Sequence, residues 1–256
     1  MPGHETPPIW TVSMPLSWPS VPSWMSISTL YELEACPRKW ALNNADFSNL
    51  WEKNGYPRAP HLAALEGSVV HSVLKKITHE LAKNQCSSLK EEKAFSVLKN
   101  LGGFTTIIQG SIASALRSFD GNPRAVRVLE GVRLRLLASV PEPRSRIQRM
   151  LSRVNFGCAA AVKANSPAKS PNGLRHRLDY GTHAEVELQA AELGWHGIAD
   201  LLTLSEKFCE IRDFKTGEPK PQHEFQVRTY ALLYARETDL NPFGRLADRL
   251  VLCVFR

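Results

Sequence analysis

The sequence predicts an α/β protein whose N-terminal half is helical and whose sheet comes from the C-terminal half. Three observations lead to this prediction. Apolar residues recur at helical spacing through residues 62–81. Alternating apolar and polar residues indicate three strands between 184 and 215. A helical pattern over 223–237 and an apolar strand over 249–256 then follow, so strands and helices alternate at the end of the chain.

The first element is expected after an irregular start. Residues 1–25 are rich in Pro, Ser and Trp and should form an irregular tail. In the segment 26–44, Thr29 and Glu32 have the spacing of a capping box at a helix N-terminus. Pro37 should interrupt or end this helix, because proline lacks the N–H that a helix interior requires.

The longest helical pattern follows, and further helices are expected after it. Its apolar positions are Leu62, Leu65, Val69, Val73, Ile77 and Leu81. Residues 87–155 are predicted to be helical, and the composition of 163–173 indicates a loop. We therefore expect a single domain over residues 26–256, with a helical insertion at about 80–180.

Composition narrows the classes of function. The 256-residue chain is 43% hydrophobic, which is enough for a core, and carries a net charge of +7 with a pI near 9.3. This charge favours an anionic partner such as nucleic acid. No apolar run approaches the roughly 18 residues of a membrane span, and the start does not resemble a signal peptide. Five scattered cysteines without a CxxC pair favour a reducing compartment, so we expect a cytoplasmic protein.

Two acids and a lysine are expected to meet on one hairpin. Asp213 and Lys215 lie two apart on a strand, so their side chains share a face. If Glu206 and Lys207 form a two-residue turn, Asp200 falls directly opposite Asp213. Adjacent carboxylates repel unless a cation compensates them, and hard oxygen ligands suit Mg²⁺ or Mn²⁺. The lysine could orient a water or stabilise charge on a phosphate.

Further motifs flank this set in the sequence. Gly67 and His71 form a GxxxH pattern on the long helix, and Gln226 and Tyr230 form a QxxxY pattern on the later one. Glu185 or Glu187 supplies an acid on the strand before Asp200, and a CPRKW segment spans residues 36–40. In this order, with Asp200 and the Asp213-Phe214-Lys215 element, the motifs resemble the RecB-type branch of the PD-(D/E)XK nuclease superfamily.

The resemblance implies a restriction-endonuclease-like mixed sheet flanked by helices. It implies a Mg²⁺- or Mn²⁺-dependent DNA nuclease that acts on single-stranded or frayed DNA, as an exonuclease or endonuclease, with a helicase or another repair or defence protein as a possible partner. Asp200, Asp213 and Lys215 would be catalytic. The metal ligands would be His71, Asp200, Asp213 and Glu185, while Gln226 and Tyr230 would bind substrate.

One cofactor of related nucleases is not expected here. In some relatives a cysteine corresponding to Cys36 joins three C-terminal cysteines around an iron–sulfur cluster. After Tyr230 this chain has only Cys253, so we expect no iron–sulfur cluster.

Simpler interpretations of the same residues remain open. His71 could be a packed helix histidine, and Asp213 with Lys215 an ordinary ion pair on a sheet. Gln226 and Tyr230 could be a polar rim and a core aromatic. At the level of the whole chain, the alternative is a catalytically inactive nuclease-like subunit that binds DNA or supports a helicase–nuclease complex.

Overall fold

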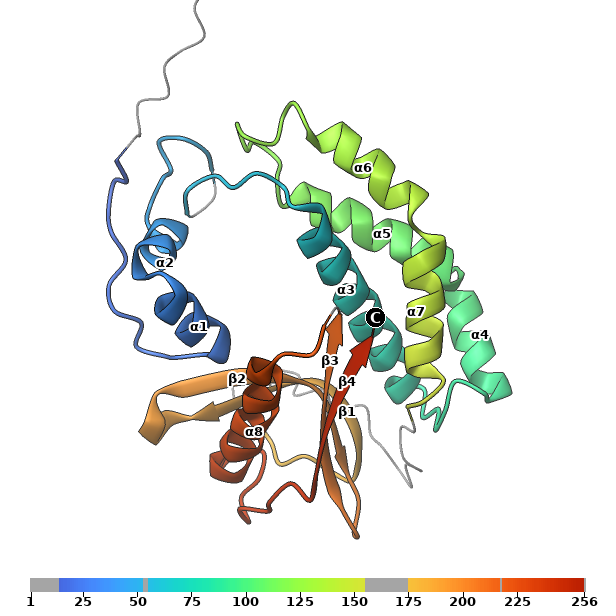
Figure 1. Cartoon of the computed structure of the whole chain (residues 1–256). Coiled ribbons are helices and arrows are strands. Elements are labelled where there is room, and N and C mark those ends of the chain that lie inside the picture. Colours follow the sequence, from blue (N-terminus) through green and yellow to red (C-terminus); the bar gives the residue numbers. More distant parts are fainter. Residues whose placement is uncertain (1–13, 53–54, 155–174, 217, 256) are drawn as a thin grey trace, which may run out of the picture.

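A four-stranded mixed sheet forms the centre of the C-terminal half (Figure 1). The computed structural model describes residues 14–52, 55–154, 175–216 and 218–255. The sheet order is β1-β2-β3-β4, with β1/β2 and β2/β3 antiparallel and β3/β4 parallel. The strands are β1 (Gly181–Ala190), β2 (Trp195–Leu204), β3 (Cys209–Thr216) and β4 (Arg249–Phe255). The predicted α/β class with a mixed sheet flanked by helices is confirmed.

Helices cover both faces of this sheet. α8 (Pro221–Arg236) connects β3 to β4, as a parallel pair requires. The helical half contributes α1 (Ile27–Ala35), α2 (Pro37–Asn44), α3 (Leu62–Lys83), α4 (Glu92–Asn100), α5 (Gly103–Arg117), α6 (Leu129–Ala138) and α7 (Pro141–Leu151). Helices α3 to α7 lie together beside the ends of β3 and β4, as Figure 1 shows. A 3₁₀ turn, η1 (Ala191–Leu193), joins β1 to β2.

The core is divided between the two sides of the sheet. Under α8, buried strand residues such as Val186, Leu202 and Ile211 pack with Val227 and Leu233 of the helix. On the other side, Leu201 and Phe214 join the core of the helical half. The sheet is thus apolar on both faces, which fixes its position between α8 and the α3–α7 group.

Helix α3 follows the predicted pattern. Its positions Leu65, Val69, Val73, Ile77 and Leu81 are buried as expected. The helical interpretation of residues 87–155 is confirmed by α4 to α7 within the described residues. The expected loop at 163–173 lies outside the described residues.

The predicted capping box at the start of α1 is wrong. Ser26, not Thr29, is the N-cap, and its Oγ accepts a hydrogen bond from the Thr29 backbone N–H at 3.1 Å. The helix ends at Ala35, and Cys36 caps the next helix by accepting from Lys39 N–H at 3.4 Å. Pro37 therefore begins α2 at the first turn, where its missing N–H costs nothing.

Residues 14–25 contain no helix but are tied to the domain at two points. Leu16 N–H donates to Asp46 O at 2.7 Å, and Met25 N–H donates to Gly194 O at 2.7 Å. Met25 also forms a parallel bridge with Trp195 at the start of β2. Across the described segments, none of the helices has the length and apolarity needed to span a bilayer.

Candidate active site

Three acidic residues occupy one row across β1, β2 and β3. The pairs Ala184–Leu201 and Val186–Ala199 place Glu185 opposite Asp200. In the β2–β3 hairpin, the pairing of Leu201 with Arg212 places Asp200 opposite Asp213. The two-residue turn predicted at Glu206 and Lys207 is confirmed, because the flanking Ser205 N–H donates to Phe208 O at 2.9 Å.

The backbone ladder is interrupted at this row. Glu185 has a φ of 55°, which is unusual for a residue other than glycine, and the β1–β2 pairing skips it. The β2–β3 ladder ends one position before the row. There Asp200 Oδ2 accepts a hydrogen bond from the Phe214 backbone N–H at 2.6 Å. A side-chain oxygen thus takes the position of the backbone carbonyl that would continue the ladder. The acids therefore lie where the strands separate.

Asp200 is half-buried in an environment that opposes its ionisation. Burial raises the pKa of its carboxyl group to about 7, and the neighbouring charges of Asp213 and Glu185 act in the same direction. The hydrogen bond from Phe214 and the charge of Lys215 oppose this rise. Near neutral pH, Asp200 is thus poised between its acid and its carboxylate.

Asp213 is still more deeply buried, with 1% of its surface exposed. Its Oδ2 forms an ion pair with Lys215 Nζ at 2.8 Å, yet this oxygen accepts no hydrogen bond from any described residue. A buried carboxylate oxygen without a hydrogen bond is costly unless another positive group satisfies it. This property suits a cation ligand.

Helix α3 brings two side chains to the acids. His71 is half-buried, and burial together with the charge of Lys215 lowers the pKa of its imidazole, although Asp213 and Glu185 partly counter this. The imidazole is therefore neutral at neutral pH, the form that binds a metal. One turn later, Lys75 Nζ forms an ion pair with Glu185 Oε2 at 3.1 Å.

Helix α8 lies against the same acids. Tyr230 is buried, and burial raises the pKa of its phenol, with further increases from Asp213, Asp200 and Glu185. Gln226 Nε2 donates a hydrogen bond to the Tyr230 hydroxyl one turn away. The geometry holds Tyr230 in place, whereas the substrate-binding role of this pair stays a prediction.

Sequence reasoning did not identify three residues that shape this site. Lys75 follows His71 by four positions on one helix face, so helical spacing could have indicated it. His223 lies three residues before Gln226 on α8. Burial lowers the pKa of its imidazole, the charge of Lys215 lowers it further, and the charge of Asp213 raises it. At Gly197, an added Cβ would lie 2.6 Å from Tyr230 Cε1, and no local pattern in the sequence indicates that contact.

The donor set fits a hard divalent cation in its chemistry. Carboxylates and one neutral imidazole are suitable ligands for Mg²⁺ or Mn²⁺. Over the described residues, no three His, Cys, Asp or Glu side chains are already grouped closely enough to hold an ion. Two of the acids are instead paired with lysines, Glu185 with Lys75 and Asp213 with Lys215.

Comparison with known proteins agrees with this geometry. The sequence model of the PD-(D/E)XK nuclease superfamily matches residues 24–255, which covers the whole sheet, α3 and α8. No curated protein and no solved structure matches the chain significantly. Since the match spans nearly the full length, the chain belongs to the PD-(D/E)XK nuclease superfamily.

Proposed function

We propose that this protein is a divalent-metal-dependent nuclease of the RecB-like type that hydrolyses phosphodiester bonds in single-stranded or frayed DNA. The observation that carries the proposal is the row of Glu185, Asp200 and Asp213, with Lys215 2.8 Å from Asp213. Nucleases of this superfamily generally use divalent metals such as Mg²⁺.

Each side chain has a role in this proposal. Asp200 and Asp213 would hold the metal, with His71 and Glu185 as further ligands. The bound metal would supply an activated water and offset negative charge on the phosphate. Lys215, at the end of β3, is close enough to the acids to orient that water or to stabilise the charge that develops on the phosphate.

The side chains of helix α8 would position the substrate and would take no part in the chemical step. Gln226 holds the Tyr230 hydroxyl, and the Tyr230 ring closes against Gly197 beside the acids. In this arrangement a phosphate would meet the exposed part of Gln226 before it met Tyr230, because Tyr230 is only 6% exposed.

The RecB-like assignment rests on motif order. The GxxxH pattern from Gly67 to His71 and the QxxxY pattern from Gln226 to Tyr230 supply side chains to the same acids. The proposal includes Mg²⁺ or Mn²⁺ as cofactor, no iron–sulfur cluster, a cytoplasmic location and a possible helicase partner.

The test is cleavage of end-labelled single-stranded DNA by the purified protein in Mg²⁺ or Mn²⁺, compared with EDTA. Frayed duplex DNA and RNA of the same sequence serve as alternative substrates. Asp200→Ala, Asp213→Ala and Lys215→Ala should each abolish cleavage, whereas Glu206→Ala, which removes an exposed acid at the turn of the same hairpin, should not.

The alternative is a nuclease-like subunit that binds DNA without cutting it. Wild-type protein that binds single-stranded DNA but leaves it intact in either metal would favour this alternative. Cleavage that persists at full rate in Asp213→Ala would contradict the assignment of the metal site.

A further inference from the structure

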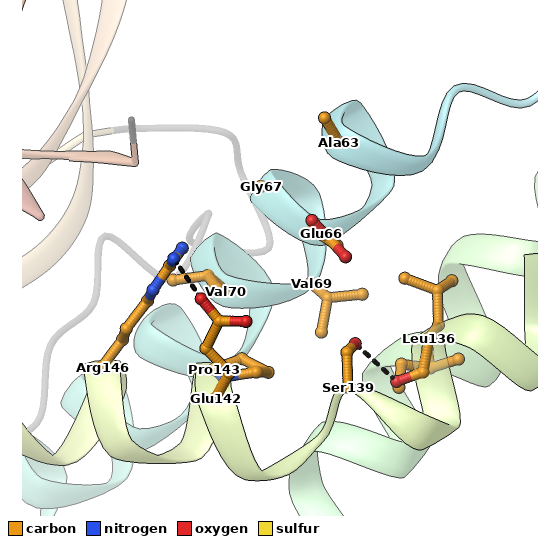
Figure 2. A pocket seen from close by; sticks show the side chains of 11 residues that line it. Ala63, Glu66, Gly67, Val69, Val70, Leu136, Ser139, Glu142, Pro143 and Arg146 are labelled. Carbon is orange, nitrogen blue, oxygen red and sulfur yellow. Dashed lines mark hydrogen bonds and ion pairs between the residues drawn. The ribbon is translucent and has the colours of Figure 1, made fainter. Parts of the chain in front are cut away.

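A cavity of about 200 Å³ lies between α3 and the helices packed against it, with Gly67 of the GxxxH pattern in its wall. Figure 2 shows side chains from α3, α6 and α7 around it. Its walls are largely apolar and include Val69, Val70, Ile112 and Leu136, while Glu66, Glu142 and Arg146 supply charge.

The cavity is close to the metal ligands in this proposal. Gly67 lines it and precedes His71 by four residues on α3, which corresponds to a rise of about 6 Å along the helix. A base that enters the cavity from a strand bound at the acids would therefore have to span about one turn of α3. This placement points to the substrate strand as the source of the occupant.

The size of the cavity favours one class of ring. An apolar cavity of about 150 Å³ is known to accept benzene, which has six heavy atoms. A cavity of about 200 Å³ is larger by roughly a third, which corresponds to a single six-membered ring with two exocyclic substituents. A pyrimidine base has this size, whereas a purine has a second fused ring.

Two of the three charged side chains, Glu66 and Arg146, supply complementary hydrogen-bonding groups. Glu66 extends from α3 as an acceptor, and no hydrogen bond or ion pair joins it to another described residue. Arg146 extends from α7 as a donor, and it also pairs with Glu142. The Ser139 hydroxyl donates to Leu136 O at 3.0 Å, so its oxygen can still accept.

We propose that this cavity binds a cytosine base of the substrate strand next to the scissile phosphate. Glu66 would accept a hydrogen bond from the exocyclic amine, the group by which acidic side chains recognise cytosine. Arg146 would donate to the ring carbonyl. Thymine and uracil present a carbonyl where cytosine has its amine, and that oxygen would meet the Glu66 carboxylate. The inference rests on the proposed nuclease function.

The first test maps cleavage positions in single-stranded DNA of mixed sequence. Wild-type protein should cut beside cytosine roughly 5- to 100-fold more often than beside thymine. Glu66→Gln keeps the shape of the side chain but adds an N–H donor, so the preference should fall or turn toward thymine. Glu80→Gln makes the same charge change near the other end of α3 and should keep the cytosine preference.

A second measurement separates this inference from the proposed function. Binding of fluorescent oligo-dC and oligo-dT is compared in Ca²⁺ by anisotropy, which requires no cleavage. Tighter binding of oligo-dC that is lost in Glu66→Gln and kept in Glu80→Gln would support the base pocket even if no cleavage occurred. The base pocket would be overturned by equal binding or cutting at both bases, or by no binding to either oligonucleotide. A preference that is unchanged in Glu66→Gln would overturn it too.

Discussion

The half-buried Asp200 and the buried Asp213 place two carboxyl groups side by side, next to a lysine, Lys215, whose charge is already paired with Asp213. At the scale of single residues, the chain therefore accepts an electrostatic cost at this position. Such a cost is typical of sites that bind or react, because a structural core would replace these groups by apolar ones.

The first prediction concerns the pH dependence of stability without metal. The folded pKa of Asp200 is raised to about 7, so the folded protein favours the protonated acid. Its contribution to stability is present below pH 4 and is lost as the pH rises to about 7, by at most roughly 4 kcal/mol. Asp200→Asn should therefore stabilise the metal-free protein at pH 8 and leave it nearly unchanged at pH 4.

Urea unfolding in EDTA at the two pH values measures this difference. Glu206→Gln, at the exposed turn of the same hairpin, should show no such pH-dependent gain. A loss of stability in Asp200→Asn at pH 8 would mean that the ionised carboxylate supports the fold.

The second prediction concerns Gly197, against which the Tyr230 ring packs. A Cβ at this position would lie 2.6 Å from Tyr230 Cε1, so Gly197→Ala should displace the ring and cost about 1–3 kcal/mol of unfolding free energy. Gly131→Ala is the control, because nothing lies within 4 Å of its Cβ on helix α6. That change should be neutral or stabilising by up to about 1 kcal/mol. Equal thermal midpoints for both variants would contradict the close packing of Tyr230.

At the scale of elements, the site forms where three strands and two helices meet. Strands β1, β2 and β3 supply Glu185, Asp200 and Asp213, helix α3 supplies His71 and Lys75, and α8 packs Tyr230 against the acids. The Lys75–Glu185 ion pair links α3 to β1 across a long separation in the sequence. Because the Lys75 side chain is 58% exposed, this pair contributes little to stability and acts mainly on the charge of Glu185.

The third prediction follows from that pair. If Lys75 competes with a metal for Glu185, Lys75→Gln should tighten Mn²⁺ binding by about 1.5- to 5-fold, in line with the strength of exposed ion pairs. Lys76→Gln removes the same charge from the neighbouring, exposed position of α3 and should change the affinity less. Calorimetric titration of Mn²⁺ measures both. Weaker binding in Lys75→Gln would show that the lysine supports the site.

At the scale of the whole molecule, the basic charge is concentrated in the helical half. Residues 117–153 contain nine arginines and three acids. Four arginines of this stretch are exposed and form no ion pair with any described residue, namely Arg127, Arg135, Arg149 and Arg153. Arg133 and Arg146 instead pair with acids on their own helices. This half is thus the part of the chain best suited to follow a nucleic-acid backbone.

The fourth prediction is that single-stranded DNA binding falls steeply with salt. The slope of log affinity against log salt concentration should become less steep by about 2 in a variant with Arg135, Arg149 and Arg153 changed to Gln. The reason is that each lost phosphate contact releases about 0.7 fewer counterions from single-stranded DNA. Lys207→Gln, at the turn of the β2–β3 hairpin, should leave the slope unchanged. The slopes are measured in Ca²⁺ by anisotropy. A flat salt response in the wild type would show that these charges do not hold the DNA.

Much of this arrangement could be predicted from the sequence, because it depends on local rules. The two-residue turn at Glu206 and Lys207 fixes the register that places Asp200 opposite Asp213. The apolar spacing of α3 fixes its buried face. The capping-box prediction for α1 is wrong because Ser26 and Thr29 are both good N-cap residues, and the helix begins after Ser26.

Other features depend on contacts between distant segments. The positive φ of Glu185 and its pairing with Lys75 arise only when β1 meets α3. The packing of Tyr230 on Gly197 and the cavity beside Gly67 likewise require the assembled helices. Spacing along the chain carries no signal for such contacts, so they could not be predicted.

The central claim is that Glu185, Asp200 and Asp213 form a metal site, and diffraction from crystals grown with Mn²⁺ tests it most directly. We expect an anomalous peak about 2.0–2.2 Å from carboxylate oxygens of Asp200 and Asp213, with the Lys215–Asp213 contact lengthened beyond its present 2.8 Å. At saturating Mn²⁺, an anomalous peak at another place in the protein would contradict the claim. The absence of a peak, with the Lys215–Asp213 ion pair unchanged, would contradict it as well.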